Sequence, residues 1–422
     1  MNLQSADPGA PYRLRHAEPL LAASLLDSPA VLLHGPRQSG KTTLARHVSS
    51  AGREYFSFDD FALREAAVFD PVGFVDRLPP RVMLDEVQRV PGLFAQLKLA
   101  IDKQRVPGRF LLAGSANLLA LPTLADSLAG RLALVPVLPF SQAEWGGVAN
   151  PVAAALHSGD WDALSGRRWQ PLRGALLEAI AGGGYPAALQ RAPGRRRAWY
   201  RDYVKSIVER DLLDLVRLRS PDVVQPLLSA VVAATGQILN LSELASGLAA
   251  SRPTLTTYLQ WLERLFLVDV LPAYANNRLS RLIKTPKVHV ADTGIGCALL
   301  GLEARDLAAD PVVAGRLLES FVHAELRRWY ASGDDPPSMF HFRDREGYEV
   351  DLVLEWGVRA VVGVEVKLAA SVQPRDFRGL RRLAEACGTR FRAGVIFHDG
   401  EHLLSFGQGL YAVPLAALWN PA

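Results

Sequence analysis

The residues best suited to chemistry lie near the N-terminal end of the chain. Residues 35–42 read Gly-Pro-Arg-Gln-Ser-Gly-Lys-Thr, which fits the pattern GxxxxGK[ST] in full, after an apolar run and before a helical one. The two glycines let the backbone turn so that successive amides face an anion, and a helix start adds partial positive charge. The segment therefore predicts a phosphate-binding loop made of Gly35, Pro36, Arg37, Gln38, Ser39, Gly40, Lys41, Thr42 and Thr43.

A second motif supplies the acids that such a loop needs. Residues 81–88 read Arg-Val-Met-Leu-Asp-Glu-Val-Gln, a short apolar strand that ends in two carboxylates. Lys41 is expected to bridge the β- and γ-phosphates, while Thr42 and Asp85 hold Mg²⁺. Glu86 is placed to polarise the water that attacks the γ-phosphate. Because both motifs are present, we expect hydrolysis of ATP rather than binding alone, with ATP and Mg²⁺ as cofactors.

Small polar residues follow the next apolar strand, at 109–113. Here the chain resembles the AAA-type ATPases, in which a polar sensor residue ends this strand. That resemblance makes Asn117 the first sensor candidate and Ser115 the second. It also makes Arg131 a candidate arginine finger, which would act on a neighbouring subunit's nucleotide and so require a homo-oligomer. An arginine after a helix is more often a surface or capping residue, and both interpretations stay open.

These motifs require a sheet that gathers strand ends along one edge. Apolar runs at 31–34, 55–58, 81–84 and 109–113 alternate with amphipathic stretches, which is typical of a parallel sheet covered by helices. We therefore expect an α/β P-loop ATPase domain of the AAA type over residues 13–150. A disordered lead-in at 1–12 precedes it, and a mainly helical segment at 151–222 follows it.

The middle of the chain has the pattern of a helix-turn-helix. Residues 241–249 and 251–259 are two helical stretches joined by a tight turn, and a strand-like run follows at 266–271. This predicts a winged helix-turn-helix at 223–290, whose second helix could enter a DNA groove. The side chains available for DNA contacts are Arg252, Thr254, Thr256 and Thr257. Because such residues also cap and pack helices, a purely structural module is the alternative.

The C-terminal part carries a third constellation. Glu319 lies on a predicted helix, Asp351 and Glu365 lie on two predicted strands, and Lys367 follows two residues after Glu365. This order resembles the PD-(D/E)xK nuclease fold, so residues 291–422 are expected to form a restriction-endonuclease-like α/β domain. The three carboxylates could converge on a hard divalent cation and Lys367 could orient water beside it. Many such domains only bind nucleic acid, and acids at strand ends can be simply solvated, so cleavage stays open.

The order of all these motifs resembles one prokaryotic family. It is the AAA-type ATPases with a nuclease-like C-terminal domain of unassigned function. Besides the motifs above, the resemblance rests on Asp-Glu-Val-Gln at 85–88, Gly-Gly-Tyr-Pro at 183–186 and Ala-Asp-Thr-Gly at 291–294, and it covers about residues 13–419. It implies an ATPase core and no settled substrate.

Composition limits the remaining classes of protein. The 422 residues, 49% of them hydrophobic, can bury a large core and suggest two or three domains. Two cysteines without a CxxC pair fit a reducing compartment. No apolar run approaches the roughly 20 residues of a membrane span, and no secretory signal is seen, so we expect a cytoplasmic protein.

The formal charge of +4 favours a polyanionic partner only weakly, so the position of the charge matters more. Basic side chains gather in two stretches, Arg195, Arg196, Arg197, Arg201, Lys205 and Arg210 in one and Arg375, Arg378, Arg381 and Arg382 in the other. Each stretch is either a nucleic-acid face or a solvated helix surface. The favoured function is an ATPase that acts on DNA, with a metal-dependent nuclease step as an optional addition. The alternative is a nucleotide-dependent switch or chaperone-like regulator that binds a protein partner.

Overall fold

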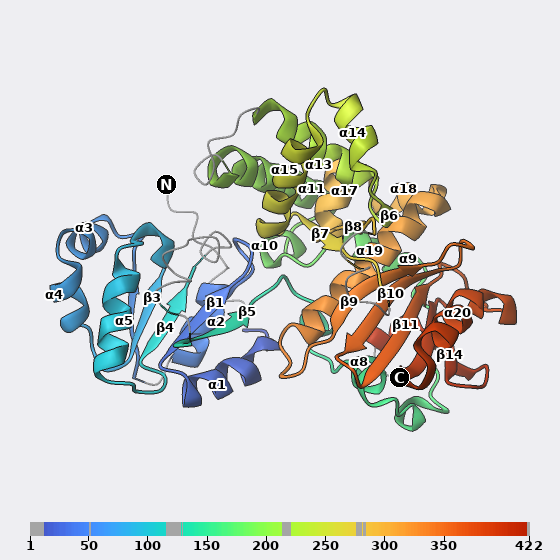
Figure 1. The fold of residues 1–422 in the computed structure, drawn as a ribbon, viewed down its shortest axis with the longest axis horizontal. Coiled ribbons are helices and arrows are strands. Elements are labelled where there is room, and N and C mark those ends of the chain that lie inside the picture. Colours follow the sequence, from blue (N-terminus) through green and yellow to red (C-terminus); the bar gives the residue numbers. More distant parts are fainter. Residues whose placement is uncertain are drawn as a thin grey trace. The chain divides into compact units, whose positions relative to one another are not determined.

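The structure is a computed structural model that describes residues 12–49, 52–114, 128, 130–212, 221–275, 281 and 284–419. The predicted lead-in at 1–12, except Tyr12, lies outside these residues. The chain divides into two units (Figure 1). The first comprises residues 1–139 with the short segments 264–266 and 331–334, and the second comprises residues 140–263, 267–330 and 335–422. Among the described helices, none combines the length and apolarity that crossing a membrane requires.

The first unit is built on a parallel sheet with the strand order β2-β3-β4-β1-β5. Its elements are α1 (Ala17–Asp27), β1 (Ala30–His34), α2 (Lys41–Ser49), β2 (Glu54–Ser57), α3 (Phe61–Phe69), α4 (Pro71–Asp76), β3 (Val82–Asp85), the 3₁₀ turn Val87–Arg89, α5 (Leu93–Lys103), β4 (Phe110–Ala113) and β5 (Leu132–Pro136). The predicted parallel α/β sheet is confirmed. Strand β5 is an addition to it, although Leu-Ala-Leu-Val at 132–135 is an apolar run, because no strand was predicted there.

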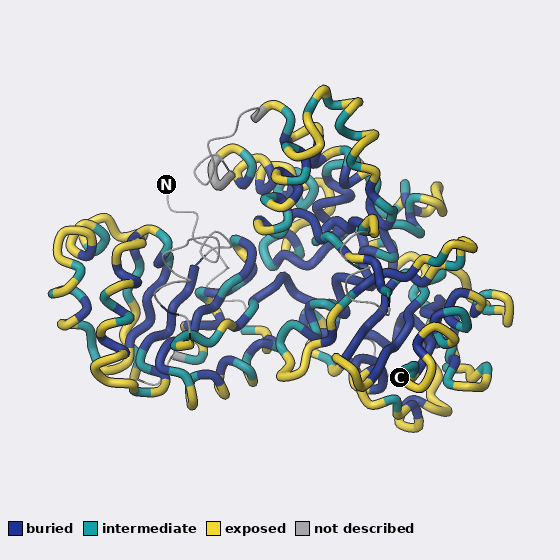
Figure 2. The backbone as a smooth tube through the Cα atoms, viewed as in Figure 1, coloured by how far each residue is buried: buried dark blue, intermediate teal, exposed yellow. Residues whose placement is uncertain are grey.

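Both faces of this sheet are covered, which explains its continuous apolar strands. Along β1, Val31 and Leu33 pack into a core with α1 and α2, whereas Ala30 and Leu32 pack into a second core with α5. Alternate side chains of a strand point to opposite faces, so a strand between two helical layers must be apolar at every position. Figure 2 shows these central strands buried.

The second unit holds two sheets, one of three strands in the order β6-β8-β7 and one of six in the order β13-β14-β12-β11-β10-β9. The helices before the three-stranded sheet are α7 (Gln142–Gly146), α8 (Pro151–Ser158), α9 (Gly174–Gly182), α10 (Pro186–Leu189), α11 (Pro193–Ser206), the π-helical turn Ile207–Leu212 and α13 (Val224–Ala233). Then follow β6 (Gln237–Ile238), α14 (Leu241–Gly247), α15 (Arg252–Arg264), β7 (Val268–Leu271) and β8 (Lys287–Val290). The three strands pair antiparallel, with β8 in the middle.

The six-stranded sheet is mixed. Between β8 and this sheet lie the helices α17 (Thr293–Leu300), α18 (Ala304–Ala309) and α19 (Pro311–Tyr330). The strands are β9 (Ser338–Arg343), β10 (Glu349–Trp356), β11 (Ala360–Val366), β12 (Phe391–His398), β13 (Leu404–Ser405) and β14 (Leu410–Pro414), and α20 (Arg378–Cys387) lies between β11 and β12 in the chain. Strands β9, β10 and β11 pair antiparallel, whereas β11, β12 and β14 pair parallel. Helix α20 packs on one face through Leu380 and Leu383.

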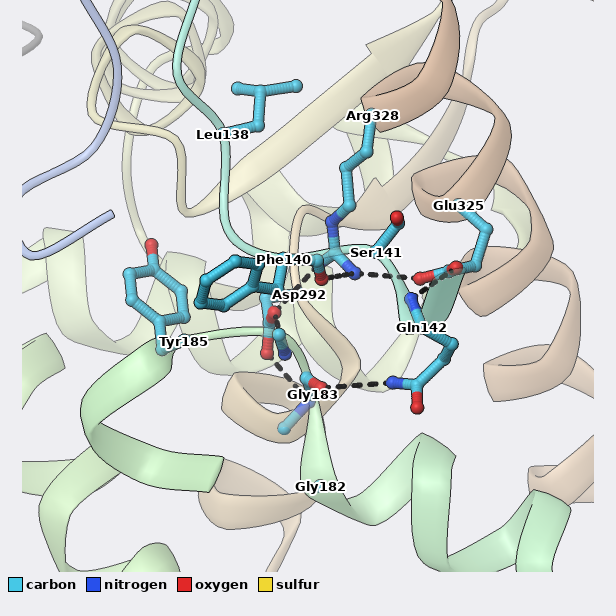
Figure 3. A network of polar contacts seen from close by, with 12 residues as sticks. Leu138, Phe140, Ser141, Gln142, Gly182, Gly183, Tyr185, Asp292, Glu325 and Arg328 are labelled. Atoms are coloured by element: carbon cyan, nitrogen blue, oxygen red, sulfur yellow. Dashed lines mark hydrogen bonds and ion pairs between the residues drawn. The ribbon is translucent and has the colours of Figure 1, made fainter. Parts of the chain in front are cut away.

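A buried ionic network joins distant segments within this second unit (Figure 3). The guanidinium of Arg328 on α19 donates to Asp292 (2.8 Å), to Glu325 (3.0 Å) and to the carbonyl of Phe140 (3.1 Å). Asp292 also accepts from the backbone N–H of Gly184 (2.8 Å). Motifs 183–186 and 291–294 therefore meet at one carboxylate.

Close packing explains the two glycines of the motif at residues 183–186. A Cβ atom on Gly184 would lie 2.3 Å from the carbonyl oxygen of Phe140, and one on Gly183, whose φ is +65°, would lie 2.1 Å from an Asp292 oxygen. Both distances are far below van der Waals contact, so only glycine lets the backbone approach the network this closely.

Candidate nucleotide-binding site

The phosphate-binding loop connects β1 to α2 at the carboxyl edge of the parallel sheet. Its backbone takes positive φ values at Gly35 (+149°), Gln38 (+60°) and Gly40 (+98°). A Cβ atom at Gly35 would lie 2.3 Å from the carbonyl oxygen of Val137, so the first glycine is required by close backbone approach as well as by φ. Helix α2 begins at Lys41, which places the loop amides at a helix N-terminus.

An arginine far from the motif braces this loop. The side chain of Arg15 is buried, and it donates to the carbonyl of Ser39 in the loop (2.8 Å) and to the carbonyl of Leu138 (2.5 Å). Sequence reasoning missed Arg15, because it precedes α1 in a stretch without any motif.

Lys41 is buried with its ammonium inside the loop. Its Nζ donates to the carbonyl oxygens of Pro36 (2.6 Å) and Gly35 (3.1 Å), and the residue is 8% exposed. Burial lowers the pKa of Lys41 from 10.5 to about 8, against the opposing effect of the Glu86 and Asp85 carboxylates. The ammonium is thus held where an incoming polyphosphate would meet it.

This shift predicts a pH dependence of nucleotide affinity. Above pH 8 Lys41 of the free protein is mostly deprotonated. Because the phosphates are bound by the charged ammonium, ATP binding above this pH must be accompanied by the uptake of a proton. ATP affinity should therefore fall with rising pH above that value, by up to about tenfold per pH unit. Isothermal titration calorimetry between pH 7 and pH 9.5 measures this, with Lys41→Arg as the variant that stays charged. The same slope in Lys41→Arg would mean that another group titrates.

The second motif faces the loop across the sheet edge. The Thr42 hydroxyl donates to Oδ2 of Asp85 (2.8 Å), and the hydroxyl of Tyr55 donates to the same oxygen (3.0 Å). Only β4 lies between β1 and β3, and all three strands run parallel, so the residues that follow β1 and β3 lie at the same edge of the sheet. A hydroxyl beside a carboxylate offers the oxygen ligands that Mg²⁺ prefers, so these residues fit a magnesium nucleotide. Tyr55 is a contact that the sequence does not predict.

Glu86 directly follows β3 in a left-handed conformation, with φ 55° and ψ 38°. Gln88 donates to its carboxylate at 2.5 Å. Burial and the neighbouring Asp85 raise the pKa of Glu86 above its ordinary value. A strained backbone that aims a carboxylate of raised basicity at the sheet edge suits a general base.

The sensor candidates and the finger candidate follow β4 in the chain. Asn117 and Ser115 lie outside the described residues. Arg131 makes a two-pronged ion pair with Asp102, at 2.6 Å and 3.0 Å. A role as an arginine finger would require that this pair open.

On α15, the three predicted threonine contacts have their hydroxyls engaged within the helix region. Thr256 and Thr257 each donate to the carbonyl four residues earlier, both at 3.0 Å. The Thr254 hydroxyl lies 2.8 Å from that of Ser251. Arg252 is exposed and carries the charge at the start of this helix.

The C-terminal residues come together around a lysine that sequence reasoning missed. Lys287 on β8 lies 2.6 Å from Glu319 and 3.1 Å from Asp351. Burial alone would lower the pKa of Lys287, but the neighbouring carboxylates of Asp351 and Glu319 raise this pKa above its usual range. Burial and Asp351 raise the pKa of Glu365 well above its ordinary value. Lys367 pairs with Asp376 at 3.5 Å.

Comparison with known protein families agrees with the geometry of the first unit. Residues 27–146 match a family model described as an AAA domain. Residues 173–306 match a domain of unknown function, DUF8612, and residues 314–418 match another, DUF4143. The first match, the strand order and the phosphate loop together support a P-loop ATPase domain of the AAA type in residues 27–146.

Two mycobacterial proteins are similar over most of the chain. Mb2031c of Mycobacterium bovis and Rv2008c of Mycobacterium tuberculosis, both described as uncharacterized proteins, are each 29% identical over 401 residues, which is 95% of this chain and 83% of theirs. Among solved structures, a Walker-type ATPase of Pyrococcus abyssi is 19% identical over 67% of this chain and 94% of its own, with a TM-score of 0.40. The RuvB Holliday junction branch migration motor of Thermotoga maritima is 18% identical over 61% and 89%, with a TM-score of 0.29.

Proposed function

We propose that this chain is a Mg²⁺-dependent ATPase whose nucleotide cycle acts on DNA. The observation that carries the ATPase assignment is the convergence of Thr42, Asp85 and Glu86 at one sheet edge, beside a loop that holds a buried Lys41. Each residue then has a separate task. Lys41 neutralises phosphate charge, Thr42 and Asp85 hold the metal, and Glu86 takes the proton of the attacking water. Bound Mg²⁺ supplies neutralisation of the charge that develops on the phosphates.

Support for DNA comes from the order of elements between α13 and β8. A helix, a strand, two helices and two strands follow one another, and the strands form one antiparallel sheet. We propose that this is a winged helix-turn-helix. Helix α15 buries Leu255, Leu259 and Leu262, while Arg252 at its start and Thr257 stay exposed. These exposed residues are the ones available to a DNA groove.

The two basic stretches offer less free positive charge for DNA binding than their composition suggests. Arg382 pairs with Asp344, Glu346 and Glu385, so much of its charge is neutralised within the protein. On α11, Arg197 pairs with Glu303. We therefore expect the phosphate contacts to come mainly from α15.

A single arginine tests this DNA surface. Arg252→Ala should weaken duplex binding and lower the slope of log K against log salt by about 1, because one fewer counterion is released. Fluorescence anisotropy with labelled duplex at several salt concentrations measures both effects. The matched control is Arg305→Ala, which removes another exposed arginine, on α18. Equal loss in the two variants would show that charge in general, rather than this helix, binds the DNA.

The second function, a switch that binds a protein partner, is favoured by one surface of the first unit. Helices α3 and α4 expose large apolar side chains, with Phe61 at 66%, Val68 at 57%, Phe69 at 93% and Val72 at 52%. Exposed apolar side chains in a group are typical of a protein contact. ATPase activity that ignores duplex, branched and single-stranded DNA but changes in Phe69→Ser would favour this function over action on DNA.

We also propose a homo-oligomer in which Arg131 is the finger that reaches the neighbouring nucleotide. The exposed pair of Arg131 with Asp102 would be exchanged for the phosphate. Mixed assemblies of Arg131→Ala subunits with Lys41→Ala subunits should recover part of the ATPase activity, since some sites would then combine an intact loop with an intact finger.

A further inference from the structure

The cluster of predicted metal ligands in the second unit already contains a cation of the protein's own. The ammonium of Lys287 lies at hydrogen-bond distance from Oε2 of Glu319 and Oδ1 of Asp351, and its side chain is 8% exposed. The three residues come from β8, α19 and β10. The ammonium is bound to its two carboxylate partners by charge-assisted hydrogen bonds, which are stronger than those between neutral groups.

Both carboxylate oxygens of Asp351 are used in this arrangement. Oδ1 of Asp351 accepts from Lys287, and Oδ2 of Asp351 accepts from the backbone N–H of Val366 at 3.0 Å. Mg²⁺ requires oxygen ligands at about 2.0–2.1 Å, closer than a hydrogen-bonded ammonium leaves room for. Within the described part of the chain, no three His, Cys, Asp or Glu side chains are arranged so that they could hold a metal ion. The cluster as it stands does not fit a divalent cation.

The fold keeps Lys287 in this position. Strand β8 is the middle strand of its sheet, and Lys287 is paired with Leu271 on β7 and with Ile238 on β6. Its backbone is therefore held on both sides. Lys367, the lysine expected to act beside a metal, is paired with Asp376.

We propose that Lys287 takes the place of the divalent cation in the cluster of Glu319, Asp351 and Glu365, so that this module is held closed by an internal ammonium and does not bind a metal there. The consequence is a nuclease-like fold that contributes structure or binding rather than metal-dependent cleavage.

Manganese binding to the full-length chain, without nucleotide, tests the proposal. Bound Mn²⁺ is counted by electron paramagnetic resonance for the wild type, Asp351→Asn, Lys287→Met and the double variant Lys287→Met with Asp351→Asn. We expect Lys287→Met to gain one site, at least about tenfold tighter than any binding by the wild type at this cluster. The double variant should lose that site, and Asp351→Asn alone should bind as the wild type does, because the phosphate loop contributes equally to all four.

Thermal unfolding gives a second readout. Lys287→Met should unfold at a lower temperature than the wild type, because two carboxylates lose their buried counter-ion, and Mn²⁺ should restore part of the difference. Lys287→Gln serves if the methionine variant does not fold, and Lys284→Met is the matched control at an exposed lysine. A wild-type Mn²⁺ site that Asp351→Asn abolishes would overturn the proposal. So would a Lys287→Met or Lys287→Gln protein that folds and gains no site.

Discussion

Glu86→Gln is expected to stop ATP turnover while ATP binding survives. The variant keeps the shape of the side chain and an oxygen that can accept from Gln88, but it removes the carboxylate that would take a proton from water. Loss of a general base costs about 10²–10⁴-fold in rate. Steady-state phosphate release should fall by that factor, while the affinity for ATP, measured by calorimetry, should stay near the wild-type value.

Two other variants make this result specific. Lys41→Ala should lose binding as well as turnover, because it removes the ammonium from the phosphate loop. Glu65→Gln, an exposed glutamate on α3, should behave as the wild type. Full turnover in Glu86→Gln would assign the base to another residue and leave Glu86 as a positioning group. Loss of ATP affinity in Glu86→Gln would instead indicate that the loop itself is distorted.

Arg328→Met is expected to cause the largest loss of stability among the changes considered. Methionine is close in length to the arginine stem, but it leaves Asp292 and Glu325, each about 2% exposed, without their shared cation. Breaking a buried ion pair by removing one partner costs about 3–5 kcal/mol. Urea denaturation followed by circular dichroism should show this decrease. The exposed pair of Arg359 with Asp335 is the matched control, and Arg359→Met should cost less than about 1 kcal/mol.

The loss in Arg328→Met should also depend on pH. Burial raises the pKa of Glu325 from 4.5 to about 7, and Arg328 opposes that rise, so the pKa should be higher still in the variant. A carboxyl group whose pKa is raised by folding stabilises the protein below its unfolded pKa and loses that contribution as the pH rises through its folded pKa. The variant should therefore be closest to the wild type near pH 5 and furthest from it above pH 8. A loss of stability that is equal at both values would mean that Glu325 does not titrate in this range.

Local motifs in the sequence determined those parts of the site whose geometry is set by residues adjacent in the chain. The phosphate loop needs glycines, a lysine and a threonine within eight consecutive positions, and the acids of β3 follow an apolar strand directly. Their backbone geometry is set by adjacent residues, so their spacing alone predicts both the strands and the chemistry. The parallel sheet could be predicted for a similar reason, because strands buried on both faces must be apolar throughout.

Only the tertiary structure decided which distant side chains complete these sites. Arg15 meets the carbonyl of Leu138 across 123 positions of sequence, and Lys287 meets Asp351 across 64. Neither contact follows from a repeat or a motif, since the packing of elements far apart in the chain brings these residues together. A buried lysine has the same sequence signature as an exposed one. The sequence therefore predicts three carboxylates suited to a metal, whereas the fold places an ammonium between two of them.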